Sequence, residues 1–253
     1  MSVVEILFSP SGGTEQVAEV ICKQWSREIE KIDLCNPNED FAKYNIDKDA
    51  LVLIAVPCYN GRMPQVAKER MSKIKGNGAK CAVLCVYGNR AYEDTLVELE
   101  DVANDCGFTV IAGVAAIAEH SIYLYCGIGR PNYSDENRLK EIARDIFGKF
   151  NKNIDTKPEI KGNRPYKKLS KFSIVPNKVY KTCDKCGVCV EDCPVQAIDS
   201  VTLKSDPDKC ISCMRCVYHC PKESRDVNKI KYSIISAILF KEASKPKSIE
   251  LFL

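Results

Sequence analysis

Eight of the fifteen cysteines in this 253-residue chain form two copies of one spacing pattern. The copies are Cys183-x₂-Cys186-x₂-Cys189-x₃-Cys193 and Cys210-x₂-Cys213-x₂-Cys216-x₃-Cys220. Each copy ends in Cys-Pro, and each cysteine of the second lies 27 residues after its counterpart in the first. Such a repeat places eight thiolates in one short segment, and this constrains the fold of that segment more than any other feature of the chain.

Thiolates at this spacing are typical ligands of iron–sulfur clusters. A four-iron, four-sulfur cube needs four soft ligands, and three of them come from the tight C-x₂-C-x₂-C turn. The fourth comes from the other copy of the motif, so the two copies interlock. We therefore predict two [4Fe–4S] clusters. One is assigned to Cys183, Cys186, Cys189 and Cys220, and the other to Cys210, Cys213, Cys216 and Cys193.

Zinc knuckles and disulfides are the alternative uses of so many cysteines. Zinc sites use C-x₂-C pairs separated by a spacer, which leaves the third cysteine and the Cys-Pro ending of each copy unexplained. Seven cysteines lie outside the motifs, and this odd number argues against a disulfide framework. Free thiols indicate a reducing compartment, so we expect a cytoplasmic protein. Residues 181–229 resemble bacterial-type ferredoxins, and this resemblance implies clusters of low potential.

The first 151 residues alternate predicted strands with predicted helices. Continuous apolar runs and a weaker apolar segment predict five strands, at residues 3–8, 29–34, 51–56, 81–86 and 109–118. Apolar residues at helical spacing predict helices beginning near Thr14, which is expected to cap the first of them, and at about 65–74, 96–103 and 135–150. Strands that alternate with helices predict a parallel, doubly wound α/β sheet with ligands at the carboxyl ends of its strands.

Three loops follow strands at that predicted edge, at residues 9–14, 57–63 and 87–94. The first loop is rich in glycine and hydroxyl groups and precedes a helix, so its N–H groups and side chains suit a phosphate. It is neither a Walker A loop nor a G-x-G-x-x-G loop. A tight strand-to-helix turn without a ligand is the alternative. The residues expected to contact a phosphate are Ser9, Ser11, Gly12, Gly13 and Thr14.

The first loop resembles the phosphate loop of flavodoxins, which reads Ser/Thr-x-Ser/Thr-Gly-x-Thr. Ser9, Ser11, Gly12 and Thr14 match this pattern, and Gly13 stands where asparagine is common. The other two loops combine a glycine with aromatic side chains that can stack on an isoalloxazine ring. Their expected flavin-binding residues are Pro57, Cys58, Tyr59, Asn60, Gly61, Arg62, Tyr87, Gly88, Asn89, Arg90 and Tyr92.

With Glu119–Ser121 and Gly129–Pro131, nearly the whole chain resembles the flavodoxin–ferredoxin fusion proteins of anaerobes. The resemblance implies a flavodoxin-like, five-stranded parallel sheet of order 2-1-3-4-5 over residues 1–151, with FMN as its cofactor. It also implies electron transfer between FMN and the two clusters. Two alternatives are a flavin-dependent reductase with a small-molecule substrate, and a cluster-binding module whose flavodoxin-like domain is empty. An electron carrier is favoured over an enzyme; as an enzyme it would be an FMN-dependent iron–sulfur oxidoreductase.

Charge is unevenly distributed along the chain. Residues 1–150 carry a net charge of −5, and residues 151–180 carry +6. We expect the basic linker, residues 152–180, to pack on the acidic first domain; no groove-reading motif accompanies its charge, so nucleic-acid binding is not predicted. Redox proteins are the expected partners, and a homodimer is left open.

The tail, residues 230–253, is unusually apolar. Five of its aliphatic residues recur at helical spacing and predict a helix packed on the first domain. They are Ile230, Ile234, Ile235, Ile238 and Leu239. The longest apolar stretch of the tail is too short to span a membrane, so no membrane span is expected.

Overall fold

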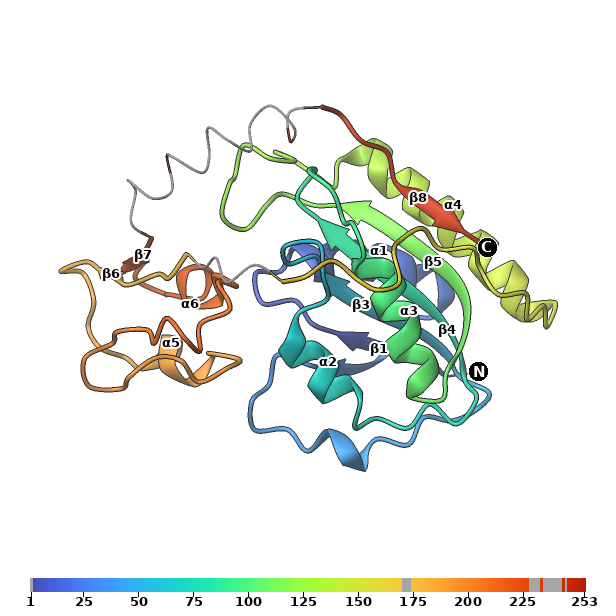
Figure 1. Ribbon diagram of the computed structural model, residues 1–253, viewed down its shortest axis with the longest axis horizontal. Helices are drawn as coiled ribbons and strands as arrows, with labels where there is room; N and C mark the ends of the chain where they lie inside the picture. Colours follow the sequence, from blue (N-terminus) through green and yellow to red (C-terminus); the bar gives the residue numbers. More distant parts are fainter. Residues whose placement is uncertain (1, 170–173, 228–232, 234–242, 244) are drawn as a thin grey trace.

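The computed structural model describes residues 2–169, 174–227, 233, 243 and 245–253 (Figure 1). Its larger part is a six-stranded sheet. In spatial order the strands are β2 (Glu30–Asp33), β1 (Val3–Leu7), β3 (Leu51–Pro57), β4 (Lys80–Tyr87), β5 (Thr109–Ile117) and β8 (Glu250–Phe252). The first five are parallel, which confirms the predicted order 2-1-3-4-5. This strand order is that of the flavodoxin-like folds.

Helices cover both faces of the sheet. On one face α1 (Gly13–Trp25) packs against α4 (Tyr133–Asn151), and on the other α2 (Gln65–Met71) lies beside α3 (Thr95–Asp105) (Figure 1). The short 3-10 helix η1 (Phe41–Lys43) follows β2. The N-cap of α1 is Gly12, whose φ of 86° suits glycine, and Thr14 lies inside the helix. The predicted cap by Thr14 is therefore wrong.

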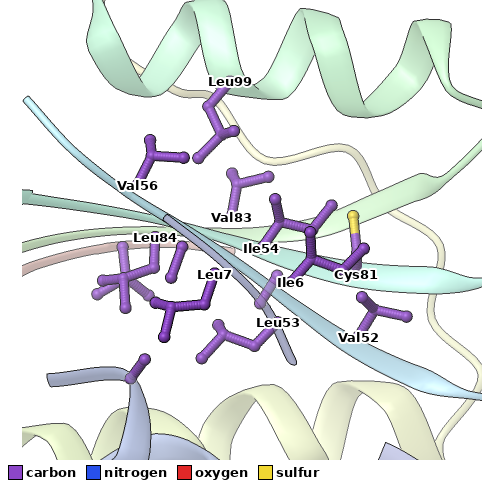
Figure 2. Close-up of a cluster of buried hydrophobic side chains, with 14 of the residues drawn as sticks. Ile6, Leu7, Val52, Leu53, Ile54, Val56, Cys81, Val83, Leu84 and Leu99 are labelled. Carbon is purple, nitrogen blue, oxygen red and sulfur yellow. The ribbon is translucent and has the colours of Figure 1, made fainter. Parts of the chain in front are cut away.

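The core explains why the predicted strands were continuous apolar runs. Figure 2 shows Val56 and Val83 on the side of Leu99 of α3, with Leu53 and Leu84 on the opposite face of the same strands. Side chains alternate between the two faces of a strand, and here both faces are covered by helices. Every residue of β1 and six of the seven residues of β3 are accordingly buried.

The sixth strand comes from the end of the tail. β8 pairs antiparallel with β5, with Leu251 opposite Val114. Ile249 just before β8 is buried in the core of the first domain. Because β8 covers the otherwise open edge of β5, the predicted five-stranded sheet is extended by one strand. Between residues 228 and 244 the predicted tail helix lies outside the described residues, apart from Ser233 and Ala243. The prediction is wrong for the end of the tail, where Glu250–Phe252 form a strand.

The basic linker lies against α3. Asp94, at the start of that helix, accepts hydrogen bonds from the backbone N–H groups of Asn163 (2.8 Å) and Lys167 (2.6 Å). Arg164 forms ion pairs with Asp101 (2.6 Å) and with Glu100 (2.8 Å). The basic linker is thus held on the acidic first domain by specific hydrogen bonds and ion pairs.

A small second domain contains both cysteine motifs. It comprises β6 (Lys178–Val179), α5 (Val188–Glu191), α6 (Arg215–Tyr218) and β7 (Arg225–Asp226), with β6 and β7 paired antiparallel. In each motif the chain turns after the second cysteine and enters a short helix. This helix is α5 in the first motif and α6 in the second. No helix within the described ranges is long and apolar enough to cross a membrane.

Candidate cofactor sites

The second domain encloses two cavities, and each is lined by four cysteines. The first is lined by Cys183, Cys186, Cys189 and Cys220. The second is lined by Cys193, Cys210, Cys213 and Cys216. The fold therefore brings together the two crossed sets of cysteines that the spacing predicts. The four cysteines of each set are arranged around a cavity. Among the described residues, no three His, Cys, Asp or Glu side chains lie close enough together to bind a single metal ion. Four soft ligands around a central space fit a cluster.

The backbone of each motif turns sharply so that its cysteines face inward. Gly187 has a φ of 84° and precedes α5, and Met214 has a φ of 60° and precedes α6. Left-handed backbone at these points reverses the chain between the second and third cysteine of each motif. Glycine is the usual residue for such a turn, but Met214 carries a buried side chain there. The two motifs are thus equivalent in shape although they differ in sequence.

The two cysteine sets differ in exposure. Cys186 of the first set is exposed, whereas Cys193, Cys213 and Cys216 of the second are buried. Burial raises the pKa of Cys213 to about 12 and that of Cys216 to about 11. A thiolate at such a position needs a neighbouring positive charge, which iron would supply. The second set is therefore the more shielded of the two.

The second cavity lies against the first domain. Ile211 lines this cavity and also packs on the core of the first domain. Tyr59, in the loop after β3, packs on the same core. Pro194, which also lines the second cavity, accepts a hydrogen bond from Arg70 of α2.

Contacts between the domains continue along the carboxyl edge of the sheet as far as β5. The hydroxyl of Tyr218 in α6 donates a hydrogen bond to the carbonyl oxygen of Ser121 (3.2 Å), which follows β5. Met214 packs with Tyr123 and Cys126 in a second apolar cluster. The second domain therefore covers the edge at which ligands of α/β sheets bind.

The predicted phosphate loop forms a tight turn between β1 and α1. The Ser9 hydroxyl accepts a hydrogen bond from the N–H group of Glu15 (3.0 Å) across the turn, and Gly12 has left-handed backbone. A Cβ atom on Gly13 would lie 3.3 Å from Cβ of Ala118. Gly13 thus permits a close approach to the end of β5, which accounts for the departure from the asparagine common in flavodoxins. Ser11 is partly exposed and Thr14 is buried in the first turn of α1.

The loop after β3 is a tight turn, and its arginine, Arg62, pairs with a residue of α3. Tyr59 and Arg62 exchange backbone hydrogen bonds across Asn60 and Gly61. The guanidinium of Arg62 pairs with Glu98 of α3 through two hydrogen bonds of 2.7 Å. The expectation that Arg62 contacts the flavin is therefore not supported. Pro57 and Cys58 lie at the end of β3, and the Cys58 thiol points to the carbonyl oxygen of Ala91 (3.6 Å).

The loop after β4 is held by the tail. Asn89 is buried and donates hydrogen bonds to the carbonyl oxygens of Ala243 (2.5 Å) and Lys245 (3.0 Å). The Tyr92 hydroxyl donates to Glu250 (3.2 Å), and its ring packs on Tyr87 with centroids 5.4 Å apart. Asn89, Tyr92 and Tyr87, all predicted flavin residues, thus have partners in the protein. Arg90 pairs with Glu93 of the same loop.

His120 lies beside this loop. A Cβ atom on Gly88 would overlap its ring, at 2.5 Å, so the two residues pack tightly. Its Nδ1 accepts hydrogen bonds from the N–H groups of Ile122 and Tyr123. Burial and the charge of Arg90 lower the pKa of His120 to about 4, so the ring is neutral at pH 7 and is protonated on Nε2.

Residues 182–224 match the sequence family described as a 4Fe–4S dicluster domain. A flavodoxin from the domain Archaea is 17% identical over 60% of this chain and 99% of its own, with a TM-score of 0.44. The two-electron reduced Megasphaera elsdenii flavodoxin is 20% identical over 56% and 98%, with a TM-score of 0.38. The rubredoxin oxygen:oxidoreductase from Desulfovibrio gigas is 14% identical over 61% and 37%, with a TM-score of 0.44. No curated protein matched the chain.

Proposed function

We propose that this chain, a flavodoxin-like domain fused to a 4Fe–4S dicluster domain, transfers electrons between FMN in the first domain and two [4Fe–4S] clusters in the second. FMN exchanges one or two electrons and each cluster exchanges one, so such a protein connects two-electron with one-electron donors. The observation that supports the proposal is that Ile211, which lines the second cysteine cavity, packs on the core of the first domain, on which Tyr59 of the loop after β3 also packs.

The phosphate loop and the two cysteine sets would have different roles in this transfer. The phosphate loop, residues 9–14, would hold the FMN phosphate through backbone N–H groups and hydroxyls. The second cysteine set, which adjoins the first domain, would exchange electrons with the flavin. The first set, which includes the exposed Cys186, would exchange electrons with a partner protein.

The covered edge supports a carrier rather than a reductase. A reductase needs space for its substrate beside the flavin. That substrate would enter at the carboxyl edge of the sheet. Tyr218 and Met214 contact the loop after β5 there. Electron transfer between the domains needs them to be in contact, and these contacts favour it.

The test begins with anaerobic purification of the full chain. We expect about eight irons and one FMN per chain, because each motif completes one cluster. A reduced low-potential donor protein is then added, and the loss of flavin absorbance (bleaching) is followed over time. Cys213→Ser should slow the bleaching most, Cys186→Ser should impair reaction with the donor protein, and the control Cys106→Ala should do neither. Zinc in place of iron, or no flavin in the purified protein, would contradict the proposal.

A further inference from the structure

Arg225 of β7 is a buried cation in the second domain. The residue is 4% exposed. Its guanidinium donates hydrogen bonds to the carbonyl oxygens of Leu203 (2.8 Å) and Pro176 (2.7 Å) and to the hydroxyl of Ser205 (2.9 Å). Its Nε has no partner in the described part of the chain. The oxygen atoms that accept these hydrogen bonds are thus all neutral.

The side chain lies in the wall between the two cysteine cavities. Arg225 lines the first cavity, and its Nη1 is 3.8 Å from Sγ of Cys189. Its partners Pro176 and Ser205 line the second cavity. One guanidinium therefore borders the first cysteine cavity and donates hydrogen bonds to residues that line the second.

No carboxylate neutralises this charge. None of the ion pairs among the described residues includes Arg225, whereas Arg62, Arg130 and Arg164 each pair with Asp or Glu. A buried charge without a counter-charge is costly. The two cysteine sets are the groups beside it that become anionic when a cluster is bound, so they are the natural counter-charges.

We infer that Arg225 is a counter-ion shared by both clusters and that it raises the reduction potential of each. The inference rests on the proposed function, since it presupposes two clusters. Reduction transfers one electron from an external reductant to a cluster and adds one negative charge in a shielded site. A fixed cation nearby stabilises the reduced form more than the oxidised form, and charge is one of the factors that set cluster potentials. Arg225 is thus a tuning residue rather than a ligand.

The experiment is an anaerobic redox titration of the full-length protein, with sodium dithionite as reductant and both clusters followed by electron paramagnetic resonance. Arg225→Gln should lower the equilibrium constant for reduction of each cluster at least tenfold, which is about 59 mV for a one-electron couple. Arg225→Lys keeps the charge and should stay within threefold of wild type. Lys222→Gln is the matched control, because it removes a charge from the exposed wall of the first cavity and should shift the potentials less.

The outcomes separate the inference from the proposed function. Wild-type protein without two cluster signals would contradict the proposed function and the inference with it. Two wild-type signals that Arg225→Gln leaves unchanged, or a shift in one cluster alone, would overturn the inference only. If Arg225→Gln fails to assemble clusters, Arg225→Lys decides between the outcomes. Unchanged reduction potentials in this variant support the inference. A tenfold fall in the equilibrium constant for reduction of either cluster refutes it.

Discussion

Arg70 and Pro194 join the two domains through a hydrogen bond from Nη2 of the arginine to the carbonyl oxygen of the proline. Nη1 of the same arginine donates to the carbonyl oxygen of Leu34 (2.6 Å) at the end of β2. Pro194 directly follows Cys193 and lines the second cysteine cavity. One side chain of α2 thus fixes a cluster-binding segment to the carboxyl edge of the sheet.

Replacing this arginine should loosen the contact between the domains. Arg70→Ala removes two charge-assisted hydrogen bonds, each worth roughly 1.5–3 kcal/mol. We expect slower electron exchange between clusters and flavin, with iron and FMN contents unchanged, measured by stopped-flow absorbance. Arg138→Ala, on the exposed face of α4, is the control and should have no effect. Equal rates for Arg70→Ala and wild type would show that this bond does not position the domains.

Cys193→Ser should damage the cluster held by the other motif. Its sulfur lines the cavity of Cys210, Cys213 and Cys216, so its loss should remove about four irons of eight. The double variant Cys193→Ser/Cys213→Ser should lose no more iron than the single variant. Cys193→Ser/Cys186→Ser should lose both clusters. The reverse pattern in iron and sulfide analysis would mean that each motif completes its own cluster.

Thr14→Val should weaken FMN binding. The substitution removes a hydroxyl from the loop that would hold the phosphate, and a hydrogen bond to a charged group is worth on the order of 1.5–3 kcal/mol. Flavin fluorescence titration of the apo-protein measures the change. Thr109→Val is the matched control, because the Thr109 hydroxyl faces Gly78 at the opposite end of β5. Equal affinities in both variants would place the phosphate elsewhere.

Acid should release the linker from α3. Burial alone would raise the pKa of Asp94, but hydrogen bonds from Lys167 and Asn163 outweigh it and lower that pKa. Stabilisation by Asp94 is therefore complete above the unfolded pKa of about 3.9 and is lost as the pH falls through the lower folded value. Asp94→Asn should reduce the dependence of the unfolding free energy on pH below about pH 4. A pH profile of Asp94→Asn identical to that of the wild type would argue against the linker contact.

Removing the last strand should destabilise the first domain and free the second. Deletion of residues 249–253 exposes the β5 edge and removes buried Ile249, whose burial alone contributes about 1.5–3 kcal/mol. Thermal unfolding should occur at lower temperature, and small-angle scattering should change from a compact to a flexible two-body profile. Deletion of half-exposed Leu253 alone is the control. A flexible profile in the intact chain would refute a fixed arrangement.

Features that depend on local pattern were predictable from the sequence. Strand β3 was visible because both its faces are buried, which makes residues 51–56 continuously apolar. The pairing of Cys193 with the second motif followed from spacing, since a cube requires ligands from both copies. The strand order followed from the alternation of strands and helices together with the flavodoxin resemblance.

Features that depend on distant partners were not predictable. Arg62 stands among glycine and aromatic residues that suggest a flavin loop, yet its partner Glu98 lies 36 residues away. The three residues of β8 carry no strand signal without the open edge of β5. Arg225 has no local motif, because segments around residues 176 and 205 create its environment. Arg70 likewise gains its role only when Pro194 is brought beside α2.

The linker and β8 both return the chain to the first domain, one on α3 before the cysteine motifs and one on β5 after them. The cluster-binding segment is thus tethered at both ends, so its contact with the carboxyl edge of the sheet does not depend on protein concentration. Electron exchange between the two domains should follow first-order kinetics whose rate constant is unaffected by dilution. Only the reaction with an external redox partner should then become slower as the protein is diluted.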